Sequence, residues 1–101
     1  MTAYLTVRAE VPEADRDAFD EWYETEHLSD AKAKFKARSA YRGWSDVTPG
    51  VHIAIYEFSD LETARAIAAS DEIKALIQEF DRIWQGRVQR TREVMAVKQM
   101  I

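Results

Sequence analysis

Hydrophobic and polar residues alternate along the start of the chain. Within residues 2–10, Ala3, Leu5, Val7 and Ala9 share one side of an extended chain, and the other side is mostly polar. A period of two is typical of a strand with one buried face. We therefore expect the chain to begin with a strand whose small aliphatic side chains pack against the rest of the protein.

A helical period replaces this alternation after Pro12, which fits the first turn of a helix because that turn does not need its N–H. The helix predicted over residues 13–27 carries one stripe at i, i+3, i+4, i+7 and i+8. The stripe consists of Phe19, Trp22, Tyr23, Glu26 and His27. A buried stripe more usually ends in aliphatic residues, so its two titratable members mark a candidate site. Ser29 predicts the N-cap of a second, short helical segment over residues 30–36.

Two strands are predicted next, over residues 38–47 and 51–58. The turn Thr48-Pro49-Gly50 joins them closely, so they should pair antiparallel. Gly43 inside the first of them indicates a bulge or a close approach by another group. The second strand has an aliphatic face, which we expect under the helices, and a more aromatic face, which we expect to lie open. The aliphatic face consists of Val51, Ile53 and Ile55, and the aromatic face consists of His52, Ala54, Tyr56 and Phe58.

The second half of the chain predicts helix and then strand. Ser59-Asp60-Leu61-Glu62 has the pattern of a capping box and opens a helix over residues 60–69. Ser70-Asp71 predicts a restart of the helix, which continues with a strong apolar stripe until Gly86 caps its end. Residues 87–100 form a last strand whose alternation is too poor to assign its faces.

The predicted order of elements is β-α-β-β-α-β, which defines an α+β, ferredoxin-like fold. This fold has a four-stranded antiparallel sheet with the helices on one face. The open face would present an apolar row that needs a cover. The row comprises Tyr4, Thr6, His52, Tyr56 and Phe58. The simplest cover is a second copy of the chain, so we expect a homodimer through the open sheet face.

Length and composition narrow the class of protein. The 101 residues suit a single domain over 1–101, and the absence of cysteine excludes disulfides and thiolate metal ligands. The net charge of −4 argues against nucleic acid as a partner. We see no secretion signal and no apolar run long enough to cross a membrane, and we expect a cytoplasmic protein.

The motif Trp22-Tyr23-Glu24-Thr25-Glu26-His27 resembles the W-Y-x-x-E-H signature of EthD-like proteins, which belong to the dimeric α/β-barrel superfamily. The resemblance implies that the sheets of two subunits pack face to face and that a small cavity lies beside the motif helix. It also implies action on aromatic or polyketide-like compounds without a metal or organic cofactor. Two residues beyond the histidine this chain has Ser29 where the family usually has proline.

His27 is the candidate catalytic residue, since an imidazole can exchange protons near neutral pH. Two alternatives are a helix-terminal histidine bonded to a last-turn carbonyl and a metal ligand. With two histidines expected on opposite layers and no cysteine, we expect no metal site. The candidate ligand-binding residues are Trp22, Tyr23, Glu26, His52 and Tyr56.

Each of these residues also has a structural interpretation. The aromatic rings could be core filling, Glu26 could pair with a lysine on the surface, and His52 could be a buried interface histidine. Four arginines near the last strand are the best case for anion binding, but we interpret them as solvated charges. They are Arg82, Arg87, Arg90 and Arg92.

Two hypotheses of function follow. The first is a binding or accessory protein that holds an apolar or aromatic small molecule. The second is a cofactor-independent enzyme of the oxygenase, cyclase or isomerase type, with His27 as acid or base. A second proton-handling group beside His27 in an enclosed cavity would favour the enzyme.

Overall fold

The computed structural model describes residues 1–101. Its elements follow the predicted order. They are β1 (Ala3–Glu10), the 3-10 turn η1 (Glu13–Asp15), α1 (Arg16–Trp22), the π-helical segment η2 (Tyr23–His27), α2 (Leu28–Phe35), β2 (Ser39–Trp44), β3 (Val51–Phe58), α3 (Leu61–Ala68), α4 (Asp71–Trp84) and β4 (Gln89–Ala96). The predicted bounds of β3 are confirmed, whereas β2 and β4 are shorter than predicted.

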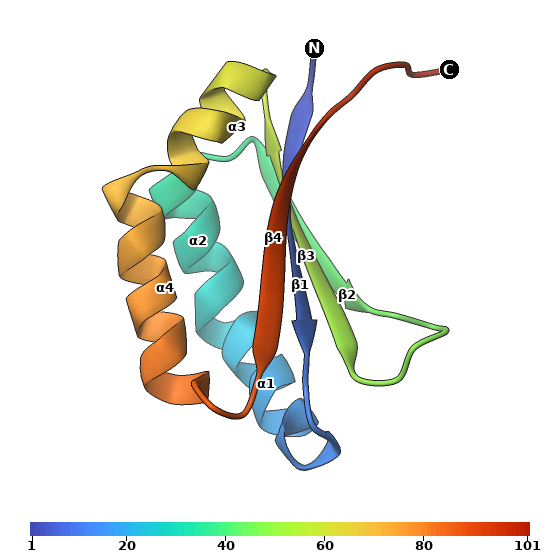
Figure 1. Cartoon of the computed structure of the whole chain (residues 1–101), viewed down its shortest axis with the longest axis vertical. Helices are drawn as coiled ribbons and strands as arrows, with labels where there is room; N and C mark the ends of the chain where they lie inside the picture. Colours follow the sequence, from blue (N-terminus) through green and yellow to red (C-terminus); the bar gives the residue numbers. More distant parts are fainter.

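The four strands form one antiparallel sheet in the order β2-β3-β1-β4. Figure 1 shows every helix on the same side of this sheet and the opposite side bare. The α+β, ferredoxin-like fold is therefore confirmed. No helix is long and apolar enough to cross a membrane.

Except at Val51, which is buried, the two faces of β3 are the reverse of our prediction. Ala54, Tyr56 and Phe58 are buried under the helices together with His52, while Ile53 and Ile55 lie on the open face. The register of the sheet explains this outcome, because β1 places its aliphatic residues Ala3, Leu5, Val7 and Ala9 opposite these four side chains. The two alanines of β1 leave room for the rings of Phe58 and His52, so the aromatic face of β3 fills the space between sheet and helices.

The first helical region is one continuous helix, so the prediction of a new N-cap at Ser29 is wrong. Its 3-10, α and π segments succeed one another until Phe35, and the backbone leaves the helix through Lys36, which adopts a left-handed conformation (φ 54°). Both flanks of the π segment have helical backbone angles. His27 is therefore held inside a helix and not at a frayed end.

The second helical region restarts where the sequence predicts. The hydroxyl of Ser70 accepts a hydrogen bond from the N–H of Ile73 and caps α4. At the start of α3, the N-cap is Asp60 and not Ser59, because the Asp60 carboxylate accepts the N–H of Thr63 at 2.8 Å. A carboxylate also suits the positive end of the helix dipole.

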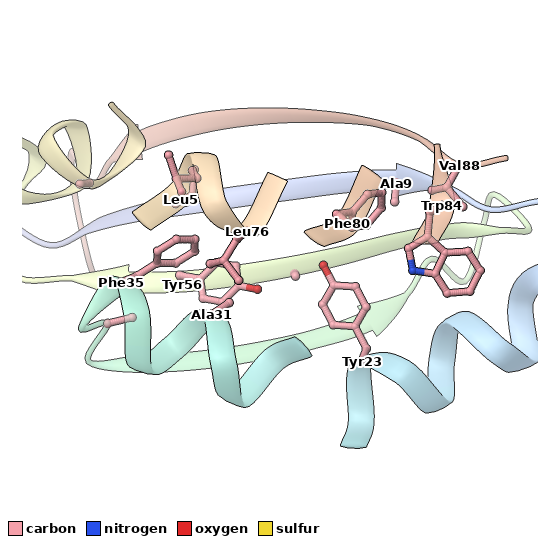
Figure 2. Close-up of a cluster of buried hydrophobic side chains, with 14 of the residues drawn as sticks. Leu5, Ala9, Tyr23, Ala31, Phe35, Tyr56, Leu76, Phe80, Trp84 and Val88 are labelled. Atoms are coloured by element: carbon pink, nitrogen blue, oxygen red, sulfur yellow. The ribbon is translucent and has the colours of Figure 1, made fainter. Parts of the chain in front are cut away.

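The core lies between the helices and the sheet. Figure 2 shows aromatic rings from η2, α2, β3 and α4 meeting in this layer. Phe19, in the middle of α1, is fully buried and contacts the rings of Trp22, Tyr23, Phe80 and Trp84. This cluster fixes α1 against α4 and so fixes the position of the π-helical segment that follows α1.

Candidate functional site

The π-helical segment determines which side chains of the motif point inward. The N–H of Leu28 donates to the carbonyl of Tyr23, five residues earlier, which is the bond that defines a π turn. The wider turn brings residues four and five apart onto one side, so His27 stays on the buried side of the helix with Tyr23. Glu26, which a regular α-helix would place on the same stripe, is exposed. Single π turns inside α-helices are frequent at functional sites.

His27 is held by two aromatic neighbours. Its ring stacks on Trp22, with 4.2 Å between centroids, and meets Tyr23 edge-on at 4.8 Å. Only 7% of the residue is exposed. The imidazole therefore has a fixed orientation and very little contact with bulk water.

A small cavity lies beside His27 between the helices and the sheet. Its volume is about 20 Å³, and a water molecule needs roughly 10–15 Å³ on the same measure, so the cavity has room for about one water. The apolar lining residues are Leu5, Val7, Phe35, Ile73, Leu76 and Ile77. The polar ones are Tyr23, His27, Tyr56, Arg90 and Arg92. Figure 2 shows the Tyr23 ring projecting from its helix into this layer, toward Tyr56.

Burial sets the protonation of the lining groups. It lowers the pKa of His27 to about 4, and the charge of Arg90 acts in the same direction. Burial also raises the pKa of the Tyr23 hydroxyl to about 12 and raises the pKa of Tyr56. At neutral pH the cavity is thus lined by a neutral imidazole and two protonated phenols.

The β4 side of the cavity is positively charged. Arg90 and Arg92 lie on the helix-facing side of β4, opposite Ala9 and Val7 of β1. Burial lowers the pKa of Arg90 to about 10, with a further effect from Arg92, and lowers the pKa of Arg92. Both groups nevertheless remain charged at neutral pH.

The interpretation of all four arginines as solvated charges is therefore wrong for Arg90, whose side chain is largely buried. It holds for Arg82 and Arg87, which are exposed and pair with Glu79 and Asp15. Arg92 is exposed as well, but it also borders the cavity. The signal was present in the sequence, because Arg90, Arg92, Val94 and Ala96 alternate along the strand. It could not be assigned to a face without the pairing of β4 with β1.

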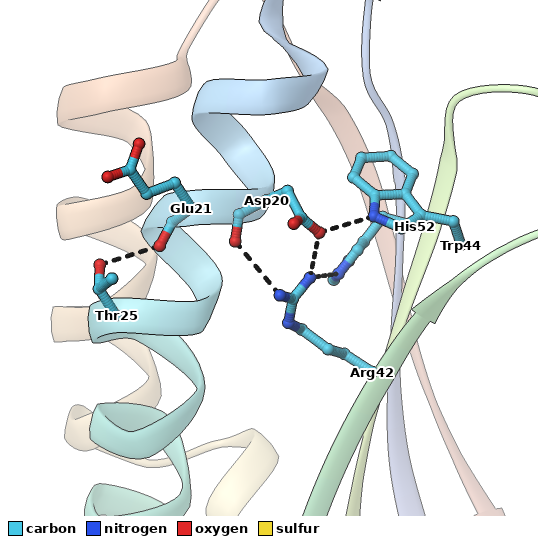
Figure 3. Close-up of polar contacts among 6 residues, drawn as sticks. All are labelled: Asp20, Glu21, Thr25, Arg42, Trp44 and His52. Carbon is cyan, nitrogen blue, oxygen red and sulfur yellow. Dashed lines mark hydrogen bonds and ion pairs between the residues drawn. The ribbon is translucent and has the colours of Figure 1, made fainter.

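His52 belongs to a different polar cluster, shown in Figure 3. Asp20 Oδ1 accepts hydrogen bonds from Arg42 Nη1 and Trp44 Nε1, both at 2.8 Å, and Arg42 Nη1 lies 3.3 Å from His52 Nε2. These two bonds lower the pKa of Asp20, whereas burial and the Arg42 charge lower the pKa of His52 to about 4. The cluster ties β2 and β3 to α1. Its buried His52 Nδ1 has no hydrogen-bond partner.

The structure separates the candidate residues into three groups. His27, Tyr23 and Tyr56 line the cavity. Trp22 supports His27 by stacking, and His52 contacts the Tyr23 ring at 4.4 Å, but neither borders the cavity. Glu26 is exposed. No group of three or more histidine, aspartate or glutamate side chains is arranged to hold a metal ion.

The fold is shared with several solved structures. An EthD family protein from Bacillus halodurans superposes with a TM-score of 0.74 at 20% identity, over 96% of this chain and 99% of that one. The protein HapK from Hahella chejuensis superposes with a TM-score of 0.66 at 16% identity, over 99% of this chain and 93% of that one. SnoaB from Streptomyces nogalater, a cofactor-independent oxygenase, superposes with a TM-score of 0.65 at 12% identity, over 99% of this chain and 96% of that one.

These similarities support the resemblance drawn from the motif, since the chain has the fold of an EthD family protein along nearly its whole length. Because the sequence identities are 20% or lower, these similarities show a shared fold. No family model matches the sequence, and no curated protein has a significantly similar sequence.

Proposed function

We propose that the protein binds a small apolar or aromatic molecule in the cavity beside His27. One observation carries the proposal: a buried, neutral imidazole borders a cavity that two buried phenol hydroxyls also line. Buried polar groups that converge on a mostly apolar cavity are typical of ligand sites, in which they fix the orientation of the ligand.

A ligand larger than water requires the cavity to widen. Of the lining residues, Ile77 is partly exposed and Arg92 is exposed, so their side chains can move without opening the core. Rotamer changes of this kind are common when proteins bind partners. We therefore expect a ligand of about one aromatic ring, with its ring among the aliphatic lining residues and its polar group toward His27 and Tyr23.

Calorimetric titration with phenol tests this proposal. Wild-type protein should bind phenol, and His27→Gln should weaken binding about threefold to tenfold, the effect of one hydrogen bond. Glu26→Gln is the matched control, since it alters the neighbouring exposed residue. Equal affinity in all three proteins, or no binding to the wild type, would contradict the proposal.

The second candidate function is an enzyme in which His27 accepts or donates a proton. Tyr23 and Tyr56 favour it, because they supply further proton-handling groups on the same cavity as the neutral imidazole. Similarity in fold to a cofactor-independent oxygenase is compatible with this alternative.

Deuterium exchange separates the two functions. 2-Indanone has acidic C–H groups next to its carbonyl, and a base in the cavity would remove one proton to form the enolate. If the protein is such an enzyme, the wild type should accelerate the exchange of these hydrogens for deuterium in D₂O, and His27→Gln should leave the exchange at its uncatalysed rate. If it is only a binding protein, neither the wild type nor His27→Gln should change the exchange rate.

We further propose that the chain, as one domain over 1–101, forms a homodimer through the open sheet face. The residues that support this are Tyr41, Ile53, Ile55 and Met95, which replace the row predicted from the sequence. Gly43 lies among them, and nothing within its own chain comes within 4 Å of the point where a Cβ would be. A partner strand could approach closely there.

A further inference from the structure

The lining of the His27 cavity has an imbalance of charge. Two of its side chains, Arg90 and Arg92, are cations, and none is a carboxylate. The chain as a whole carries a net charge of −4, so this local excess runs against its overall charge. Arg90 is largely buried, whereas Arg92 is exposed at the edge of the cavity. Because a buried cation is costly without a partner, an anion in the cavity would stabilise Arg90 in particular.

Most N–H donors of the two guanidinium groups have no hydrogen-bond partner within the protein. Each group has five N–H donors. Arg90 is held by the Phe80 ring, 3.6 Å from its Cζ, and makes a single long hydrogen bond of 3.5 Å to Asp81. Arg92 takes part in none of the ion pairs or side-chain hydrogen bonds of the structure.

Nearby carboxylates do not neutralise the site. Asp81 is the carboxylate closest to Arg90, but 46% of its side chain is exposed and its charge is screened by water. Glu79, whose charge acts on His27, pairs with Arg82 at 2.8 Å. The positive potential is therefore available to a ligand. It also reaches Tyr23, whose pKa the charges of both arginines act to lower, although burial outweighs them.

We propose that the ligand of this cavity is an acid whose ionised oxygen, in a carboxylate or phenolate, is bound by Arg92 with Arg90 at the β4 side. The inference rests on the proposed function and narrows its ligand to aromatic acids. A guanidinium matches two oxygens of one carboxylate, and such charge-assisted bonds are about twice as strong as neutral ones. The anion would also offset the positive charge that disfavours protonation of His27, so binding should raise the pKa of His27.

Benzoate and benzamide test the inference, because they share a shape and differ in charge at pH 7. Calorimetry should show benzoate binding at least tenfold more tightly to the wild type. Arg92→Gln should remove most of this preference, because it should weaken the binding of benzoate far more than that of benzamide, and Arg92→Lys should retain part of it. Arg82→Gln is the control, since it removes an equal charge outside the cavity.

The pKa of His27, measured by NMR, supplies a second readout that a loss of folding would not mimic. Benzoate should raise this pKa in the wild type and not in Arg92→Gln, and benzamide should leave it unchanged. Equal affinity for the two compounds, or the same preference in Arg92→Gln, would overturn the acid inference but leave the cavity proposal standing. Failure of benzamide, benzoate and phenol alike to bind would overturn both.

Discussion

The side chain of His27 is buried, and this burial determines the effect of a substitution there. A histidine at an exposed helix end could be removed with little effect on stability. In the structure the ring stacks on Trp22 and borders Tyr23, so alanine would leave a hole in the aromatic layer. Glutamine, which fills more of the space and keeps a hydrogen-bonding group, is the better test of the site.

The two buried histidines predict a stability that depends on pH. Both have a pKa of about 4 when folded and about 6.5 when unfolded, so the unfolded chain binds more protons at acidic pH. The stability that the neutral histidines contribute is fully present above pH 6.5 and is lost as the pH falls toward 4. By pH 4.5, each histidine should have lowered the free energy of unfolding by on the order of 2 kcal/mol.

Urea denaturation at pH 7.0 and pH 4.5 checks this prediction. The wild type should lose stability between the two values, and His27→Gln should lose about half as much. Glu26→Gln should behave as the wild type does. A wild-type stability that is equal at both pH values would contradict the assignment of neutral, buried imidazoles.

At the scale of elements, the link between α1 and the β2–β3 hairpin depends on Asp20. Its carboxylate accepts hydrogen bonds from Arg42 and Trp44, and Arg42 is mostly buried. Asp20→Ala would leave that charge without its partner, which should cost about 1–3 kcal/mol. Chemical denaturation should detect the loss, and faster amide exchange in β2 should localise it. Asp17→Ala, on the exposed face of α1, should have little effect on either measurement.

The turn between β2 and β3 depends on Gly50. Its φ is +82°, and a Cβ there would lie 2.7 Å from the carbonyl oxygen of Val11 and 2.5 Å from Arg16 Nη2. Gly86 has a similar φ of +83° but open space around it. Gly86→Ala should therefore cost only the conformational penalty of about 1–2 kcal/mol, and Gly50→Ala should cost clearly more. Equal losses of stability in thermal unfolding would show that the contact with Val11 is unimportant.

The sequence predicts the order of elements well because period and capping are local properties. It misplaces the faces of β3, because both sets of side chains are apolar and only the small residues of β1 decide between them. It places Glu26 beside His27 on one stripe, because a regular helix is assumed where a π turn occurs. The sequence offers the arginines of the site for anion binding but does not show that Arg90 and Arg92 face the helices, since strand pairing determines which side they take.

At the scale of the whole molecule, the bare sheet face predicts assembly. Ile55 lies on this face at the centre of the sheet, opposite Thr6 of β1 and Tyr41 of β2. In a symmetric dimer each copy contributes the same patch, so Ile55→Glu would place two charges in the interface. Sedimentation at micromolar concentration should find wild-type dimers and mutant monomers.

Gln78→Glu, which adds the same charge on the exposed side of α4, is the control for this substitution and should stay dimeric. Tyr56→Glu would not test this interface, because Tyr56, which the sequence places in the open-face row, is in the core. A monomeric wild type would end the proposal of a homodimer through this face.

An NMR titration of the His27 ring signals against pH, with and without phenol, tests most directly whether a neutral, buried His27 forms the wall of a ligand site. We expect the ring to stay neutral down to about pH 5, and phenol to shift its signals saturably at pH 7, together with those of Tyr23. A ring that titrates near 6.5 and does not respond to phenol would contradict this role of His27.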